Sequence, residues 1–109
     1  PPSFPECENL DIDNHLICFR NKIEMEMNSF LEDKVFPLDT TEYVLTLRID
    51  TIGNFSLTNL LPKDKLDKKL VLIIQEAVEK LPNALPAIKT NVGEFVEVKF
   101  NLPFKLNHE

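Results

Sequence analysis

Cysteine and histidine are the residues of this 109-residue sequence whose chemistry is easiest to recognise. Cys7 and Cys18 are its two cysteines. An even number of cysteines is typical of a disulfide, and hence of an oxidising compartment. Two buried free thiols are the alternative. His15 and His108 have no second ligand at a metal-binding spacing, so neither histidine predicts a metal site.

Acidic residues near the N-terminus invite a calcium-loop interpretation, which their spacing excludes. Asp11, Asp13 and Asn14 are followed by neither the glycine nor the bidentate glutamate that such a loop requires. No hydrolase, zinc-protease or nucleotide-binding motif occurs, and a chain with two glycines has no phosphate-binding loop. The sequence therefore predicts no catalytic residue, no metal and no cofactor, in a protein that is not an enzyme.

The composition restricts the class of partner. The length corresponds to one domain. A formal charge of −6 leaves no basic stripe to neutralise the phosphates of nucleic acid. No run of about eighteen apolar residues is present to form a transmembrane helix. The chain begins at Pro1 without a methionine, which indicates a processed protein or a piece of a longer one, so any membrane anchor would lie upstream.

The strongest local pattern is a β-hairpin over residues 43–61. Two runs alternate between apolar and polar residues, and a period of two places one set on each face of a sheet. Between the runs, Gly53 and Asn54 tolerate the positive φ of a tight turn. The residues predicted on the apolar face are Tyr43, Leu45, Leu47, Ile49, Phe55, Leu57, Asn59 and Leu61.

Helices are predicted on both sides of the hairpin. Apolar residues at spacings of three and four predict the first over residues 14–35, including Leu16 and Phe19 in its buried stripe. Asp13 or Asn14 is the expected N-cap, and Pro37 ends the helix. The second is predicted over residues 63–81, with Asp64 or Asp67 as its cap and Pro82 as its end.

The last predicted element is a long strand over residues 94–106, in which Pro103 indicates a sheet edge or a bulge. Residues 82–93 read as an irregular loop, and residues 1–12 as an extended lead-in at the end of a Pro-rich linker. The order helix, strand, strand, helix, strand predicts an α+β domain over residues 13–109. We expect a three-stranded antiparallel sheet with two helices on one face.

The outer edge of the final strand is the remaining functional signal. An unpaired edge is a template for another strand unless it is protected. Pro103 and the charges of Glu97, Lys99 and Lys105 fit protection, and they fit a peptide-binding edge equally well. The residues by themselves leave both interpretations open.

Several short motifs, in this order, resemble the C-terminal periplasmic domain of the TonB family of energy transducers. FPECE at residues 4–8 is similar to the F-P-G-C-E opening of one branch, whose second cysteine falls in the first helix as Cys18 does here. IDTIG at residues 49–53 resembles the family's hairpin turn, and residues 64–81 its second helix. LPNALP at residues 81–86 resembles L-P-x-W-x-P, although Ala84 replaces the tryptophan, and residues 93–104 resemble its closing strand.

The resemblance implies a periplasmic protein-interaction domain of a Gram-negative cell, anchored to the inner membrane by an upstream segment. Such a domain takes energy from inner-membrane motor proteins and couples it to outer-membrane transport. It binds a short peptide of an outer-membrane transporter, the TonB box, by strand addition. The backbone expected to pair with this peptide belongs to Phe95, Val96, Glu97, Val98, Lys99, Phe100 and Asn101.

Two alternatives use the same fold without a transporter. The first is a sensory or assembly module with another partner. The second is self-association, in which the exposed edge pairs with a second copy to form a homodimer.

Overall fold

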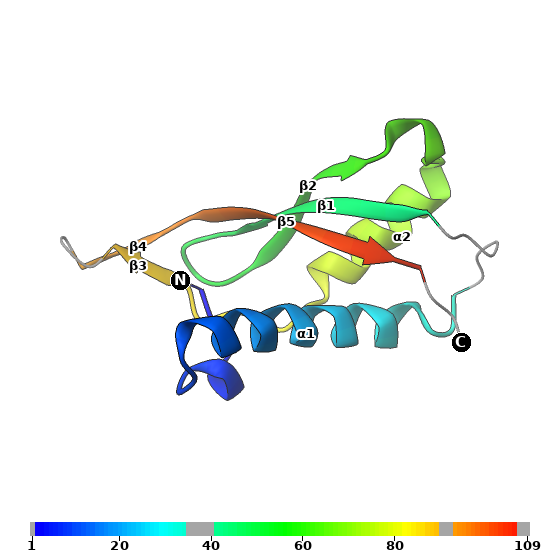
Figure 1. Ribbon diagram of the computed structural model, residues 1–109. Coiled ribbons are helices and arrows are strands. Elements are labelled where there is room, and N and C mark those ends of the chain that lie inside the picture. The colour runs from blue at the N-terminus through cyan, green and yellow to red at the C-terminus, as the bar shows by residue number, and fades with distance from the viewer. Residues whose placement is uncertain (1, 35–40, 90–92, 107–109) are drawn as a thin grey trace.

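Figure 1 shows the computed structural model of the chain, in which residues 2–34, 41–89 and 93–106 are described. The predicted α+β class is confirmed. An antiparallel sheet has the strand order β2-β1-β5, and two helices pack against one of its faces. The main elements are α1 (Ile12–Leu31), β1 (Glu42–Ile49), β2 (Phe55–Leu61), α2 (Lys68–Glu79), β3 (Ala87–Lys89), β4 (Glu94–Val96) and β5 (Val98–Lys105).

The core lies between the helices and the inward face of the sheet. Alternate residues of the central strand β1 are buried, as its period of two predicts. They pack in one apolar cluster with residues of both helices, which places α1 and α2 on the same side. The fully buried members include Tyr43, Leu45, Leu47, Ile23, Met27, Leu31, Ile74 and Val78.

The predicted hairpin is confirmed, but its second strand shifts register. Gly53 has a φ of +89° in the turn. Thr46 pairs with Asn59 whereas Leu47 pairs with Leu57, so Thr58 is an extra residue, a β-bulge. A bulge reverses the alternation beyond it. The predictions for Asn59 and Leu61 were therefore wrong, and Leu60 occupies the core position while Leu61 is 42% exposed.

The helices begin and end at different residues from those predicted. Asp11, rather than Asp13 or Asn14, caps α1 and accepts a hydrogen bond from the Asn14 amide at 2.9 Å. The predicted end of this helix around Pro37 lies outside the described residues. Asp67 caps α2 as predicted, but residues 63–65 form a separate 3₁₀ turn. No helix in the described part of the chain combines the length and apolarity that a membrane crossing needs.

The predicted final strand is broken in two at Glu97, between β4 and β5. The segment predicted as a loop contributes β3, which pairs with β4 in a separate two-stranded ribbon. Figure 1 shows this ribbon projecting from the body of the domain. The sequence did not predict this ribbon, because β3 has only three residues, too few to show an alternating pattern.

The expected extended lead-in is a packed part of the domain. Phe4 is 1% exposed and stacks on Phe19 and Phe55, with ring centroids 5.0 and 5.9 Å away. Ser3 forms a β-bridge with Leu85. We call residues 2–8 the N-terminal segment. Its burial follows from the aromatic ring of Phe4, which gains more from the core than from water.

Candidate partner-binding edge

The outer edge of β5 is unpaired within the described part of the chain. β5 pairs with β1 in unbroken antiparallel register from Val98 opposite Ile49 to Lys105 opposite Glu42. It is the end strand of the sheet in the order β2-β1-β5. The edge that the sequence left open to two interpretations therefore exists in the folded domain.

The register identifies the backbone groups that point outward from this edge. The Asp50 amide donates to the Asn54 carbonyl at 3.0 Å, and the Thr46 carbonyl accepts from the Thr58 hydroxyl. Because Asp50 directly follows β1, both contacts show that even-numbered residues of β1 direct their backbone groups to β2. Odd-numbered residues of β1 therefore direct their backbone N–H and C=O groups to β5, because these directions alternate along a strand.

The odd-numbered residues of β1 lie opposite the even-numbered residues of β5. The N–H groups of Lys99, Asn101 and Lys105 therefore point away from the sheet. Pro103 belongs to the same outward set, which explains how a proline fits here without removing a hydrogen bond from the ladder with β1. Proline also interrupts the outward row, so Lys99 and Asn101 are its consecutive donors.

The predicted site residues fall into two parts. Val98, Lys99, Phe100 and Asn101 lie on β5, with its free edge. Phe95 and Val96 lie on β4, where they pair with Ile88 and Ala87. The structure thus brings the β5 half of the prediction together as one unpaired edge and places the β4 half in the ribbon.

Glu97 stands at the break between these parts and is held by Arg48 of β1. Arg48 Nε lies 2.8 Å from Glu97 Oε1, and Nη2 lies 2.8 Å from Oε2. This bidentate hydrogen bond lowers the pKa of Glu97 and raises that of Arg48. The ion pair fixes the point at which the ribbon leaves the sheet.

A groove runs between α1 and the start of β5. Val98 and Phe100 face the helices, yet they are only half-buried, since α1 does not cover them fully. The space beside them has a volume of about 170 Å³. We call it the α1–β5 groove, and its lining residues are Pro2, Leu16, Phe19, Arg20, Val98 and Phe100.

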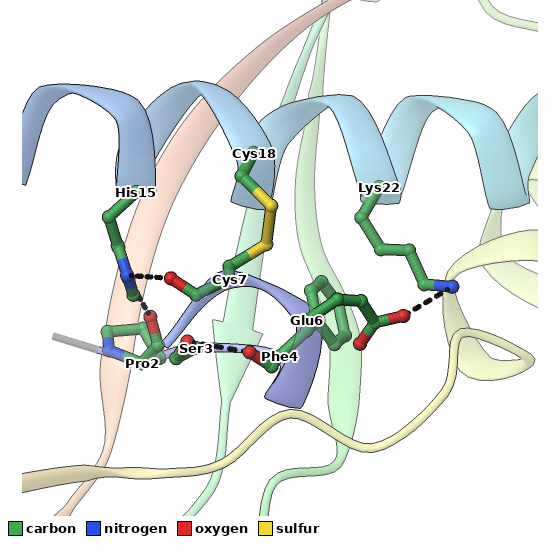
Figure 2. The surroundings of a disulfide bond; sticks show 8 residues. All are labelled: Pro2, Ser3, Phe4, Glu6, Cys7, His15, Cys18 and Lys22. Atoms are coloured by element: carbon green, nitrogen blue, oxygen red, sulfur yellow. Dashed lines mark hydrogen bonds and ion pairs between the residues drawn. A yellow bond between two sulfur atoms is a disulfide. The ribbon is translucent and has the colours of Figure 1, made fainter. Parts of the chain in front are cut away.

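The N-terminal segment supplies one wall of this groove and is fixed to α1 (Figure 2). Cys7 and Cys18 form the predicted disulfide. The buried His15 ring places Nδ1 3.1 Å from the Cys7 carbonyl and Nε2 3.2 Å from the Pro2 carbonyl. These contacts hold Pro2 at the mouth of the groove.

An ion pair between Lys22 and Glu6 also holds the N-terminal segment to α1. Lys22 of α1 lies 3.1 Å from Glu6 and 3.1 Å from Glu26. Hydrogen bonds to these two carboxylates raise the pKa of Lys22. The charge of Lys22 is thus used within the fold, so it is a structural residue in this arrangement.

Sequence reasoning missed the helical side of the groove. Leu16 was predicted in the buried stripe of α1, but it is 46% exposed beside β5. Arg20, one turn later, is exposed and lines the same groove. The sequence does contain a signal for this side of the groove: the apolar stripe on α1 is wider than one buried face requires.

The histidine and cysteine side chains in the described part of the chain are engaged within the fold. No group of three or more histidine, cysteine or acidic side chains among them is placed to hold a metal ion. His15 is engaged with two backbone carbonyls, and both cysteines with each other. His108 lies outside the described residues. The free strand edge and the adjoining groove are the features suited to a partner.

Comparison of the chain with protein-family models, curated proteins and solved structures gave no match. The unpaired edge of β5 and the α1–β5 groove are therefore the features of the molecule that indicate a function.

Proposed function

We propose that this chain is the partner-binding domain of a TonB-type energy transducer. In this proposal the domain works in the periplasm, and an upstream segment anchors it to the inner membrane and its motor proteins. It binds the TonB box of an outer-membrane transporter as an additional strand on β5. The observation that carries the proposal is the unpaired edge of β5, with outward amides at Lys99 and Asn101, beside an apolar groove.

Strand addition suits this edge for two physical reasons. Backbone groups of a peptide can continue the ladder, with each net hydrogen bond contributing about 1 kcal/mol. Alternate side chains of the same peptide would face α1 and enter the groove, which adds apolar contact to the hydrogen bonds. Backbone pairing then supplies affinity, while the groove supplies selectivity.

The test uses a substitution at an outward-facing amide. Lys99→Pro removes the N–H that faces the peptide and leaves the ladder with β1 intact, because Lys99 directs no hydrogen bond to β1. We expect its affinity for TonB-box peptides from transporters of the same organism to fall at least roughly tenfold. Lys99→Ala, which keeps the amide, is the matched control and should bind within about threefold of the parent.

The measurement is NMR titration of the labelled domain. Shifts concentrated on residues 98–101 and lost in Lys99→Pro support strand addition on β5. Equal binding by Lys99→Pro and Lys99→Ala would contradict it. Silence across a broad panel of peptides would favour a sensory or assembly module with another partner.

The same edge favours self-association as a second candidate, since a second copy offers an identical strand. Light scattering over a range of concentrations measures this directly. A dimer that dissociates in Lys99→Pro and not in Lys99→Ala would place β5 at its interface. A monomer at all concentrations would exclude this candidate.

A further inference from the structure

The seam between α1 and β5 changes its charge along its length. Beside Val98 and Phe100 the groove is apolar, and Arg20 is the one ionisable side chain among the described residues that line it. A second hollow farther along the seam, of about 360 Å³, has Glu24 and Glu42 among its lining residues. The two ends of the seam would therefore meet different side chains of an added strand.

Arg20 is available to a partner. It is exposed, and within the described residues it makes no ion pair. Lys22, two positions later, is engaged by Glu6 and Glu26. Because an engaged cation gains little from a new carboxylate, Arg20 is the cation of this helix that a ligand can use.

The far end of the seam has the opposite preference. Glu24 is half-buried and Glu42 is exposed, and neither makes an ion pair within the described residues. Lys105 and Asn28 line the same hollow, so the lysine offsets one of the two carboxylates. The described residues of this hollow therefore carry net negative charge, which would repel an acidic side chain of a ligand.

The apolar part of the seam accommodates one ligand side chain. In an added strand every second side chain faces α1. A cavity of about 150 Å³ holds a molecule of benzene, so the 170 Å³ space beside Val98 and Phe100 accepts an apolar side chain of similar size. Arg20 lies at the wall of this same space.

We propose that the β5 edge selects an extended peptide with a defined charge order. An apolar side chain enters the α1–β5 groove, an acidic residue beside it pairs with Arg20, and the end of the peptide near Glu24 and Glu42 is not acidic. This inference rests on the proposed strand addition and adds the chemistry and orientation of the ligand.

The test compares peptides that share one apolar sequence. Their termini are capped, because capping removes the terminal charges. Each carries glutamate or lysine at its first or its last position. We expect glutamate to bind roughly three- to tenfold tighter than lysine at one of these positions. The preference should weaken as salt increases.

Charge reversal on the protein separates local from general electrostatics. Arg20→Glu should reverse the preference at that position, with lysine then binding tighter. Lys69→Glu, an exposed lysine on α2, changes the net charge equally and should leave the preference as it is in the parent. A nitroxide at the preferred acidic end should broaden amide signals near Val98 more than those near Lys105.

The outcomes distinguish a failure of the charge order from a failure of the proposed strand addition on β5. Binding at β5 with equal affinity for glutamate and lysine, or with the same preference in Arg20→Glu and Lys69→Glu, would overturn the charge order alone. Failure of every peptide to bind would contradict strand addition and this inference with it. Circular dichroism of both variants checks that the fold is retained.

Discussion

Gly53 is the residue on which the turn of the hairpin depends. Its φ of +89° is unfavourable for any residue with a Cβ. A Cβ at this position would also lie 2.0 Å from the Ala84 carbonyl oxygen, in the segment that precedes β3. Gly53 and Ala84 are further joined by a hydrogen bond of 2.9 Å. The glycine therefore serves both the turn and a tertiary contact.

We expect Gly53→Ala to lower the free energy of unfolding by more than the roughly 1–2 kcal/mol that a left-handed residue costs. Gly93→Ala is the control, because its φ is also positive, +68°, but a Cβ there meets nothing within 4 Å. Urea denaturation of the two variants measures the difference. Equal losses would show that the contact with Ala84 has no energetic effect.

The Arg48–Glu97 ion pair makes a pH-dependent contribution to stability. Its hydrogen bonds lower the pKa of Glu97 below the ordinary value of about 4.3. The Glu97 carboxylate therefore binds a proton less readily in the folded state than in the unfolded state. The pair stabilises fully above the ordinary value, and this stabilisation is lost as the pH falls through the lowered pKa.

A double-mutant cycle with Arg48→Ala and Glu97→Ala measures this dependence. We expect a favourable coupling energy at neutral pH, and we expect it to decrease as the pH falls through the lowered pKa of Glu97 and the carboxyl group becomes protonated. Thermal or urea unfolding of the four proteins at neutral pH and over a series of lower pH values supplies the comparison. A coupling energy that persists at low pH would indicate a contact other than the ion pair.

At the scale of elements, the disulfide fixes the N-terminal segment to α1. Cys7 and Cys18 enclose a short loop, and closing such a loop restricts the unfolded chain. We expect replacement of both cysteines with alanine to lower the free energy of unfolding by about 3 kcal/mol. Denaturant unfolding of this variant and of the reduced native protein should agree. A loss well below 1 kcal/mol in both would show that the remaining contacts suffice.

At the scale of the whole molecule, the domain begins earlier than the sequence suggested. Phe4 belongs to the same core as the sheet and both helices, which predicts that the N-terminal segment unfolds together with them. We expect Phe4→Ala to destabilise by about 3–5 kcal/mol, as for other buried aromatic residues. Glu8→Ala changes an exposed residue of the same segment and should be close to neutral.

Calorimetry of the two variants tests this boundary. A single lowered transition in Phe4→Ala supports one cooperative domain. Similar melting temperatures for Phe4→Ala and Glu8→Ala would indicate that the N-terminal segment is a linker outside the cooperative domain.

The sequence by itself determined the elements whose signal is local. Alternation in β1 and the spacing of α1 and α2 predicted the α+β class, because a period is read from neighbouring residues. The turn at Gly53 and the cysteine pair were found for the same reason, since residue type and count are sufficient for both.

Tertiary structure alone decided the features that depend on distant residues. The bulge at Thr58 is defined only by the partner strand, and the break at Glu97 coincides with its ion pair to Arg48. The candidate site divides in the same way. Its outer strand was predicted from local alternation, whereas the groove required α1, β5 and Pro2 to meet in space. Spacing along the chain carries no information on such contacts, because folding brings together residues that are far apart in sequence.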